Sequence, residues 1–348
     1  MNNDTDEKYM RRCLQLAACG RFGAPPNPMV GAVVVCDGRI IGEGYHVRCG
    51  GPHAEVNAIN SVCDKSLLPR STVYVSLEPC AHYGKTPPCA DFLASKHVKR
   101  VVIGCVDPFA AVSGRGIARL RAAGIEVKTG VLANECRMLN RRFITFHSKK
   151  RPYIILKWAR SADGYIAPAG NAGRTFISTP LSQMCSHRLR TENDAILVGR
   201  HTAETDNPSL TARLWYGKNP LRVVLDSKAV LPSSLHLFDG EAETLAVCRA
   251  PYTDGRKSVE YFHPDYSRDI IPQLLENLHA RGIQSLIVEG GRKVLDGFLD
   301  NNLWDEIIVE QGHCLFGGGT EAPAEPAHAV WESTTRWSAD FRIARKPV

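Results

Sequence analysis

The amino-acid sequence predicts an α/β fold that is divided into two domains. Apolar segments with the length of strands alternate with segments of helical spacing in both halves of the chain, which is typical of α/β proteins. The length of 348 residues is sufficient for two domains that each bury a core. A set of metal-binding side chains occurs in the first half. We therefore expect two α/β domains with different chemistry.

Composition and charge exclude several classes of protein. The fractions of apolar (44%) and charged (23%) residues are ordinary for a globular protein and show no signature of disorder. The net charge is +7, but Lys and Arg are scattered, which favours small anions such as phosphates over nucleic acid. No apolar run reaches about 18 residues, so no transmembrane helix is expected. The polar start, Met1 to Lys8, is unlike a signal peptide, and we expect a cytoplasmic protein with reduced cysteines.

The first half is expected to form a three-layer unit with a mixed sheet. A helix is predicted between Asp4 and Gly20, and Pro25 to Pro28 forms a rigid turn. Asp37-Gly38 has the composition of a hairpin turn between two strands. The predicted strands are 30–35, 39–43, 72–77, 101–104 and 125–127.

Four side chains in this half form a pattern typical of a catalytic zinc site. His53, Cys80 and Cys89 offer one imidazole and two thiols, and Glu55 places a carboxylate two residues from the imidazole. A catalytic zinc has three protein ligands and one open position, and it lowers the pKa of bound water to about 7. H-x-E followed by P-C and a second Cys is the signature of zinc deaminases, although here nine positions separate the thiols instead of three. Cys49 is a competing ligand, but it lacks a partner at a metal-binding spacing.

The second half is expected to follow a short basic linker, 147–152. The predicted domains are therefore 1–146 and 152–348. Glu289-Gly290-Gly291 lies between a predicted strand and a helix, where a backbone can approach a phosphate, but no G-x-G-x-x-G motif follows the first strand. Thr202 and Ser227 follow buried strands, which places them at a sheet edge where ligands gather. The predicted strands are 153–159, 195–199, 221–226, 245–248, 285–289 and 305–309, and the segment 270–281 is helical.

Longer motifs in the first half resemble the bifunctional deaminase/reductase family of riboflavin biosynthesis. They are Asn27-Pro28-x-Val30-Gly31, Gly42-Glu43-Gly44-Tyr45-His46, Pro52-His53-Ala54-Glu55, Glu78-Pro79-Cys80-x-His82-x-Gly84-x-Thr86-Pro87-Pro88-Cys89 and Asp107-Pro108. The long spacing of the cysteines is usual in that family. The resemblance implies a cytidine-deaminase-like domain in which His53, Cys80 and Cys89 bind zinc and Glu55 shuttles protons. It also implies that Asn27, His46 and His82 surround a pyrimidine. From the residues alone, His46 could equally cap a turn, and Asn27 is a common turn former.

The resemblance continues through the second half. It is carried by Lys157-x-Ala159-x-Ser161-x-Asp163-Gly164, Ile177-Ser178, Arg190, Val198-Gly199, Thr202, Asp206-Asn207-Pro208-x-Leu210-Thr211 with Arg213, Asp226-Ser227 and Glu289-Gly290-Gly291. It implies a dihydrofolate-reductase-like domain that takes its hydride from NADPH. Cofactor contacts are implied for Thr202, Asp206, Ser227, Gly290 and Gly291. Contacts with a ribose-phosphate substrate are implied for Arg190, Leu210, Arg213 and Glu289. The chain departs from the family at Arg174-Thr175-Phe176, which leaves the roles of Arg174 and Phe176 undetermined.

These observations favour a two-step enzyme. We expect hydrolytic deamination of a diaminopyrimidinone that carries a ribosylamino 5′-phosphate, followed by NADPH-dependent reduction of the ribosyl group to ribityl. One alternative is a nucleoside or nucleic-acid base deaminase with a C-terminal substrate-binding module, but Tyr83 is the one aromatic residue between the two cysteines. Another is a structural zinc module, which would need four protein ligands. We expect no nucleic-acid or membrane partner, and the sequence leaves a homo-oligomer open.

Overall fold

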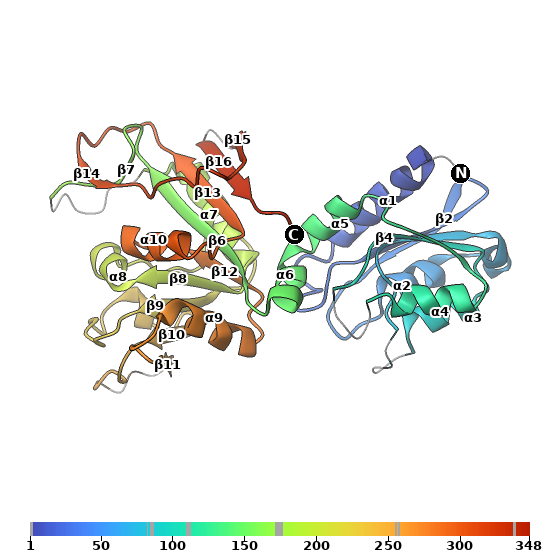
Figure 1. The fold of residues 1–348 in the computed structure, drawn as a ribbon, viewed down its shortest axis with the longest axis horizontal. Coiled ribbons are helices and arrows are strands. Elements are labelled where there is room, and N and C mark those ends of the chain that lie inside the picture. The colour runs from blue at the N-terminus through green and yellow to red at the C-terminus, as the bar shows by residue number, and fades with distance from the viewer. Residues whose placement is uncertain are drawn as a thin grey trace. The chain divides into compact units, whose positions relative to one another are not determined.

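The computed structural model describes residues 3–81, 83, 87–108, 113–170, 177–254, 256, 258–336 and 339–348. The chain separates into two compact units, with the division between Lys149 and Lys150 (Figure 1). The predicted basic linker is in part helical, because α6 continues to Lys149. Within the described ranges, no helix has both the length and the apolar content that a membrane crossing requires.

The first unit is built on a mixed five-stranded sheet with the order β2-β1-β3-β4-β5. β1 pairs antiparallel with β2 and β3, whereas β3, β4 and β5 run parallel. The strands are β1 (Gly31–Cys36), β2 (Arg39–Tyr45), β3 (Thr72–Leu77), β4 (Arg100–Cys105) and β5 (Glu126–Thr129). The helices are α1 (Asn3–Ala18), α2 (Ala54–Ser61), α3 (Cys89–Ser95), α4 (Arg115–Ala122), α5 (Ala133–Leu139) and α6 (Arg141–Lys149), with a 3-10 turn η1 (Lys65–Arg70).

Helices cover both faces of this sheet, which gives the predicted three layers (Figure 1). One face packs against α1 and α5 through residues such as Met10 and Cys136. The other packs against α2, α3 and α4 through residues such as Ala58, Leu93 and Leu120. Every residue of β1, β3 and β4 is buried, which explains why these strands are nearly continuous apolar runs in the sequence.

A buried carboxylate ties α1 to the sheet. Asp6 accepts hydrogen bonds from Tyr74 Oη (2.9 Å), Arg100 Nη1 (2.9 Å) and Lys128 Nζ (2.8 Å). Burial alone would raise the pKa of Asp6, but the hydrogen bonds from these three side chains outweigh it and lower the pKa to about 2. The helix is thereby attached to β3, β4 and β5 by charge as well as by apolar packing.

β2 and α2, the helix that has His53 as its N-cap, approach each other closely. A Cβ atom on Gly44 would lie 2.4 Å from the amide nitrogen of Ala58, so only glycine permits this contact. The connection between the two elements therefore folds back over the edge of the sheet and delivers His53 to the start of α2.

The second unit contains a larger sheet with the order β11-β10-β9-β8-β12-β6-β13-β16-β15. The strands from β11 to β13 are parallel, and β16 and β15 extend the sheet antiparallel. Its strands are β6 (Tyr153–Arg160), β8 (Ala195–Gly199), β9 (Leu221–Leu225), β10 (Thr244–Val247), β11 (Val259–Phe262), β12 (Ser285–Val288), β13 (Glu306–Gln311), β15 (Trp331–Arg336) and β16 (Ala339–Arg345). A separate two-stranded ribbon is formed by β7 (Tyr165–Pro168) and β14 (Gly319–Glu321).

Helices again lie on both faces of the large sheet (Figure 1). α9 and α10 cover one face through residues such as Leu274 and Phe298, and α8 packs on the other through Ala203. The helical elements are α7 (Pro180–Thr191), α8 (Arg200–Asp206), η2 (His236–Phe238), α9 (Ile270–Ala280) and α10 (Arg292–Asp300). The six predicted strands correspond to β6, β8, β9, β10, β12 and β13, whereas β7, β11, β14, β15 and β16 were not predicted.

Candidate functional site

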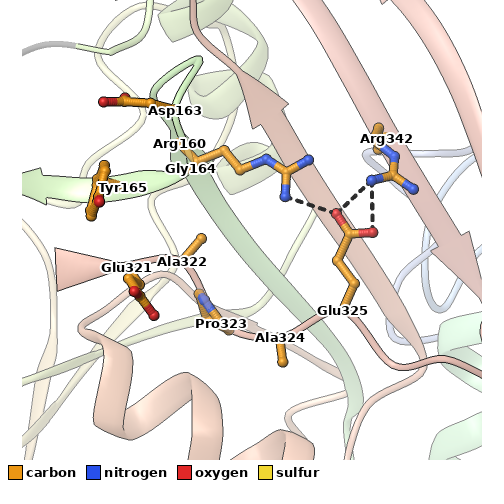
Figure 2. Close-up of a pocket in the computed structure, with 10 residues that line it drawn as sticks. All are labelled: Arg160, Asp163, Gly164, Tyr165, Glu321, Ala322, Pro323, Ala324, Glu325 and Arg342. Atoms are coloured by element: carbon orange, nitrogen blue, oxygen red, sulfur yellow. Dashed lines mark hydrogen bonds and ion pairs between the residues drawn. The ribbon is translucent and has the colours of Figure 1, made fainter. Parts of the chain in front are cut away.

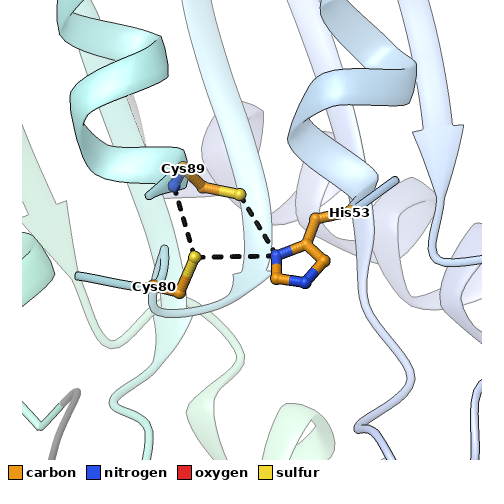
Figure 3. Close-up of side chains that lie close together, drawn as sticks. All are labelled: His53, Cys80 and Cys89. Atoms are coloured by element: carbon orange, nitrogen blue, oxygen red, sulfur yellow. Dashed lines mark hydrogen bonds between the residues drawn. The ribbon is translucent and has the colours of Figure 1, made fainter. Parts of the chain in front are cut away.

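Three side chains from separate elements converge in the first unit (Figure 3). His53 is the N-cap residue of α2, Cys80 follows β3, and Cys89 begins α3. The Nδ1 atom of His53 lies 3.6 Å from Cys80 Sγ and 3.2 Å from Cys89 Sγ. The amide of Cys89 donates to Cys80 Sγ at 3.2 Å, which fixes the second thiol beside the first. Both sulfurs therefore face one imidazole, although nine positions separate the two cysteines in the chain.

This arrangement fits a zinc ion. Zn–S and Zn–N bonds of about 2.3 and 2.0–2.1 Å with tetrahedral angles separate ligand atoms by roughly 3.5–3.8 Å. All three ligand atoms lie within 4.8 Å of one another, and no other group of this kind was found among the described residues. The Cys89 thiol donates to Cys80 and lowers the pKa of Cys80, while the same hydrogen bond raises the pKa of Cys89. Cys80 is thus prepared as a thiolate, the form that binds metal.

Glu55 lies in the first turn of α2 and is almost fully buried, with 3% of its surface exposed. Burial raises the pKa of its carboxyl group, and a nearby His53 charge acts in the opposite direction. A carboxyl group with a raised pKa can accept and release a proton near neutral pH. Glu55 is therefore suited to proton transfer beside the three ligands.

His46 and Asn27 form a hydrogen-bonded pair next to this group. The Nδ1 atom of His46 lies 3.1 Å from the carbonyl oxygen of Pro52, and its Nε2 atom lies 3.1 Å from Asn27 Nδ2. With Nδ1–H donating and Nε2 accepting, the ring is neutral, and burial lowers its pKa in agreement with this tautomer. The His46 ring stands edge-on to that of His53, with 5.3 Å between centroids. His82, the third residue expected around the pyrimidine, lies outside the described residues.

Glu78 holds the segment that carries Cys80. Its buried carboxylate accepts hydrogen bonds from the amides of Gly114 (3.0 Å), Gly116 (3.0 Å) and Ile117 (3.2 Å) at the start of α4. Gly116 is required there, because a Cβ atom would lie 2.0 Å from the carbonyl oxygen of Pro79. Glu78 was noted in the sequence within a motif, but no role was assigned to it. The sequence did contain an indication of its structural role, because Glu78 is an acidic residue that follows a buried strand and directly precedes Pro79-Cys80.

In the second unit, predicted substrate residues meet at the carboxyl ends of the central strands. Arg190 on α7 donates from Nη2 to Glu289 Oε2 at 2.9 Å and from Nη1 to the Thr211 carbonyl at 3.1 Å. Lys157 Nζ on β6 lies 3.9 Å from Glu289 Oε1. Burial raises the pKa of Glu289, but Arg190 and Lys157 outweigh burial and lower it, so the carboxylate is charged. Glu289 Oε1 and Arg190 Nε are buried without hydrogen-bond partners, which leaves polar capacity for a ligand.

A third cation, Arg213, and a neutral histidine, His187, extend this cluster. His187 is buried, and its Nδ1 atom accepts from the amide of Leu214 at 3.3 Å, which fixes the segment next to Arg213. Burial, Arg190 and Arg213 lower the pKa of His187 to about 4, so it is neutral at physiological pH. Arg213 is exposed, whereas the Leu210 side chain is buried in the core, so a ligand could meet Leu210 only through its backbone. The excess of positive charge suits an anionic group such as a phosphate.

Predicted cofactor residues lie at the same edge of the sheet. A Cβ atom on Gly291, whose φ is +70°, would lie 3.1 Å from Thr202 Oγ1, so these two residues are close. Asp206 is four residues after Thr202 on α8, and Ser227 follows β9. The close approach at Gly290 has a different cause, because its Cβ would lie 2.6 Å from Val198 Cα on β8. The bare backbone of Gly291 before α10 fits a phosphate-bearing cofactor such as NADPH. Arg174 and Phe176 lie outside the described residues.

A hollow of about 450 Å³ lies elsewhere in the second unit (Figure 2). Glu325 at its margin accepts from Arg160 at 3.0 Å and from Arg342 at 2.7 Å, so both guanidinium groups already have a protein partner. Of the described residues that line it, none is a predicted site residue. We therefore assign the hollow no part in the chemistry.

Lys157 and His187 were not assigned roles from the sequence. A lysine inside the otherwise apolar strand β6 is a signal that was available, because a buried cation requires a partner. His187 gave no such signal, since a histidine on an amphipathic helix is ordinary. Their proximity to Glu289 depends on tertiary structure, which brings together residues far apart in the chain.

Comparison with known protein families gives two matches that together span most of the chain. The family described as "RibD C-terminal domain" matches residues 152–336, and the "Cytidine and deoxycytidylate deaminase zinc-binding region" matches residues 3–105. These matches confirm the predicted fold classes, a cytidine-deaminase-like unit and a dihydrofolate-reductase-like unit.

Individual relatives cover nearly the whole chain. "Riboflavin biosynthesis protein RibD" of Bacillus amyloliquefaciens is 40% identical, covering 98% of this chain and 96% of the relative. The protein of the same name from Aquifex aeolicus is 38% identical, with coverages of 92% and 90%. A crystal structure from Thermotoga maritima, described as a diaminohydroxyphosphoribosylaminopyrimidine deaminase/5-amino-6-(5-phosphoribosylamino)uracil reductase, superposes with a TM-score of 0.87 at 38% identity and covers 99% of both chains. These similarities favour the two-step enzyme over a nucleoside or nucleic-acid deaminase.

Proposed function

Because the chain belongs to the RibD family of riboflavin-biosynthesis proteins, we propose that its two sites catalyse the two successive reactions of a bifunctional deaminase/reductase. The first unit is a zinc-dependent deaminase and the second is an NADPH-dependent reductase. The substrate that we propose is 2,5-diamino-6-ribosylamino-4(3H)-pyrimidinone 5′-phosphate. The deaminated product is then reduced at its ribosyl group to the ribityl chain.

The zinc ligands in this proposal are His53, Cys80 and Cys89. Their convergence from three elements, with all ligand atoms within 4.8 Å, supports the assignment. When bound, zinc supplies Lewis acidity that makes water nucleophilic near neutral pH. A set of three protein ligands suits catalysis, since structural zinc sites usually have four.

Glu55 is the proposed proton carrier of the deamination. It takes a proton from the attacking water and delivers it to the amino group that leaves as ammonia, so that the ring carbon gains an oxygen and loses a nitrogen. The burial that raises its pKa supports this role. Asn27 and His46 are proposed to orient the pyrimidine ring together with His82. The hydrogen bonds of His46 to Asn27 and to the Pro52 carbonyl support this role, because they fix the orientation of both side chains.

In the reductase unit, NADPH supplies the hydride, and the protein positions the sugar against it. Arg190, Arg213, Glu289 and the backbone of Leu210 are the proposed substrate contacts. Thr202, Asp206, Ser227, Gly290 and Gly291 are the proposed cofactor residues, with Gly290 acting through its packing against β8. The Oε1 atom of Glu289 accepts no hydrogen bond from the protein, which supports a hydrogen bond to a substrate hydroxyl.

The observation that carries the proposal is the coexistence, in one chain, of a three-ligand metal site and a cationic site at a parallel sheet edge. The test supplies purified protein with the pyrimidine substrate and measures ammonia release and NADPH oxidation separately. We expect ammonia release without NADPH, and NADPH oxidation only after deamination. Release of ammonia from cytidine or deoxycytidylate but not from the pyrimidine phosphate would instead favour a nucleoside deaminase.

The extent of the domains and the state of the protein in the cell are also proposed. The ranges 1–146 and 152–348 are supported by the division of contacts after Lys149. A cytoplasmic location suits a small phosphorylated substrate. A homo-oligomer and the absence of nucleic-acid or membrane partners remain expectations.

A further inference from the structure

Strands β9 and β10 end side by side at the edge that carries the proposed cofactor residues. They pair in parallel, with Leu225 opposite Val247. Two residues further along each strand are Ser227 and Arg249, and the Arg249 amide donates to the Ser227 carbonyl at 3.1 Å. The side chain of Arg249 therefore starts next to a proposed cofactor residue.

The guanidinium group of Arg249 is held against an aromatic ring but forms no ion pair with the described residues. It lies over the ring of Tyr266, 4.1 Å from the centroid. Arg249 is exposed, and in the described part of the chain no hydrogen bond or ion pair engages its guanidinium. A guanidinium that stacks on a ring keeps its N–H donors free in its own plane. Lys228, also exposed, adds a second positive charge beside Ser227.

The order of the strands indicates which part of a dinucleotide would reach this point. Each of these strands carries, or is followed by, one residue of the argument. Lys157 lies on β6 and Glu289 directly follows β12. The next three strands, β8, β9 and β10, are followed by Thr202, Ser227 and Arg249. Three strand spacings of about 4.8 Å separate β12 from β10, or about 14 Å. With the hydride-donating ring at the proposed substrate contacts, the opposite end of the dinucleotide extends over β8 and β9 to β10.

We infer that Arg249 binds the 2′-phosphate of NADPH and thereby selects NADPH over NADH. This inference rests on the proposed cofactor site. NADPH differs from NADH by this phosphate on the adenosine ribose, and a planar guanidinium binds phosphate through paired charge-assisted hydrogen bonds. Tyr266 is a positioning residue that holds the guanidinium flat, and Lys228 adds electrostatic attraction.

The test is a titration of the full chain with NADPH, NADH and adenosine 2′-monophosphate, followed by fluorescence or calorimetry. Loss of a charge-assisted phosphate contact corresponds to roughly a 10- to 100-fold weaker affinity. We expect Arg249→Met to weaken NADPH and adenosine 2′-monophosphate by this factor and to leave NADH within about twofold. Arg249→Lys should retain part of the preference, since it keeps the charge but loses the planar donors.

Arg268→Met is the matched control, because Arg268 is an exposed arginine two residues after Tyr266 and its removal changes net charge equally. It should leave the NADPH to NADH ratio unchanged, and zinc content should be normal in all variants. Equal weakening of NADPH and NADH by Arg249→Met, or no change in either, overturns the inference while leaving the cofactor site intact. Failure of the wild-type protein to bind NADPH overturns the proposed cofactor site and this inference with it.

Discussion

The Cys89 sulfur lies 3.2 Å from Nδ1 of His53, although 36 positions separate the two residues in the chain. His53 precedes α2 and Cys89 begins α3, and both helices pack on the same face of the sheet through Ala58 and Leu93. Packing of the two helices therefore brings the ligands together. Metal binding to such a prepared pair costs little conformational entropy of the chain, because packing of the core has already ordered the two side chains.

The first prediction concerns metal content. Cys80→Ser and Cys89→Ser should each lose most of the zinc, because each removes one of the three proposed protein ligands. Cys49→Ser is the control, since Cys49 is an exposed cysteine of the same unit. Elemental analysis after dialysis measures the effect. One equivalent of zinc retained in both ligand variants would contradict the assignment.

The second prediction separates proton transfer from metal binding. Glu55→Gln keeps the size of the side chain but removes the group that accepts a proton, so zinc content should be normal. Ammonia release should fall by about 10²–10⁴-fold, the usual contribution of a general acid–base group. NADPH oxidation with the already deaminated substrate should be unaffected if the two units work independently. Deaminase activity close to that of the wild type, with zinc bound, would refute the role of Glu55.

Local sequence patterns were sufficient for much of the fold. Fully buried strands such as β3 and β8 appear as continuous apolar runs, and the hairpin at Asp37-Gly38 is marked by its turn residues. The strands β15 and β16 were missed because neither is a continuous apolar run: β15 has no buried residue, and β16 mixes buried with exposed positions. The α7 helix was missed because its apolar residues are few and its buried positions include Ser182 and His187.

The same distinction between local and tertiary information applies to the candidate sites. The proximity of His53, Cys80 and Cys89 could be anticipated because H-x-E followed by P-C and a second Cys is a known motif. The Glu289–Arg190 ion pair joins residues 99 positions apart, and no local pattern contains that information. The packing role of Gly290 was also beyond sequence reasoning, because glycine before a helix looks the same whether it faces a phosphate or the backbone of β8.

The third prediction concerns the stability of the first unit and its dependence on pH. The pKa of Asp6 is about 2 in the folded chain, against 3.8 for an ordinary aspartate. A lowered folded-state pKa stabilises the fold at pH values above the unfolded-state pKa, and the contribution is lost as pH falls through the folded-state pKa. The ionised carboxylate should therefore contribute about 2 kcal/mol to the free energy of unfolding at pH 7 and roughly half of that at pH 3.

Asp6→Asn tests this contribution. Urea unfolding of wild type and variant should give a difference in unfolding free energy that is largest above about pH 5 and shrinks as the pH is lowered toward 3. Effects of acid on zinc binding are shared by both proteins and cancel in the difference. A difference that is constant across this pH range would show that the charge of Asp6 does not stabilise α1 against the sheet.

The last prediction uses two glycines with the same φ of +70°, Gly291 and Gly317. Alanine at either position is strained by about 1–3 kcal/mol, because both glycines have a φ that L-residues rarely adopt. A Cβ atom on Gly291 would lie 3.1 Å from Thr202 Oγ1, whereas one on Gly317 would meet nothing within 4 Å. Because Thr202 is a proposed cofactor residue, Gly291→Ala should weaken NADPH binding by about tenfold, equivalent to about 1.4 kcal/mol. Gly317→Ala should leave it within about twofold.

Gly290→Val would not make this distinction, because the valine side chain would clash with β8 and disturb the sheet. The measurement is a fluorescence titration with NADPH, with ammonia release as the control for folding. Equal NADPH affinity in the two alanine variants would show that Gly291 does not contact the cofactor.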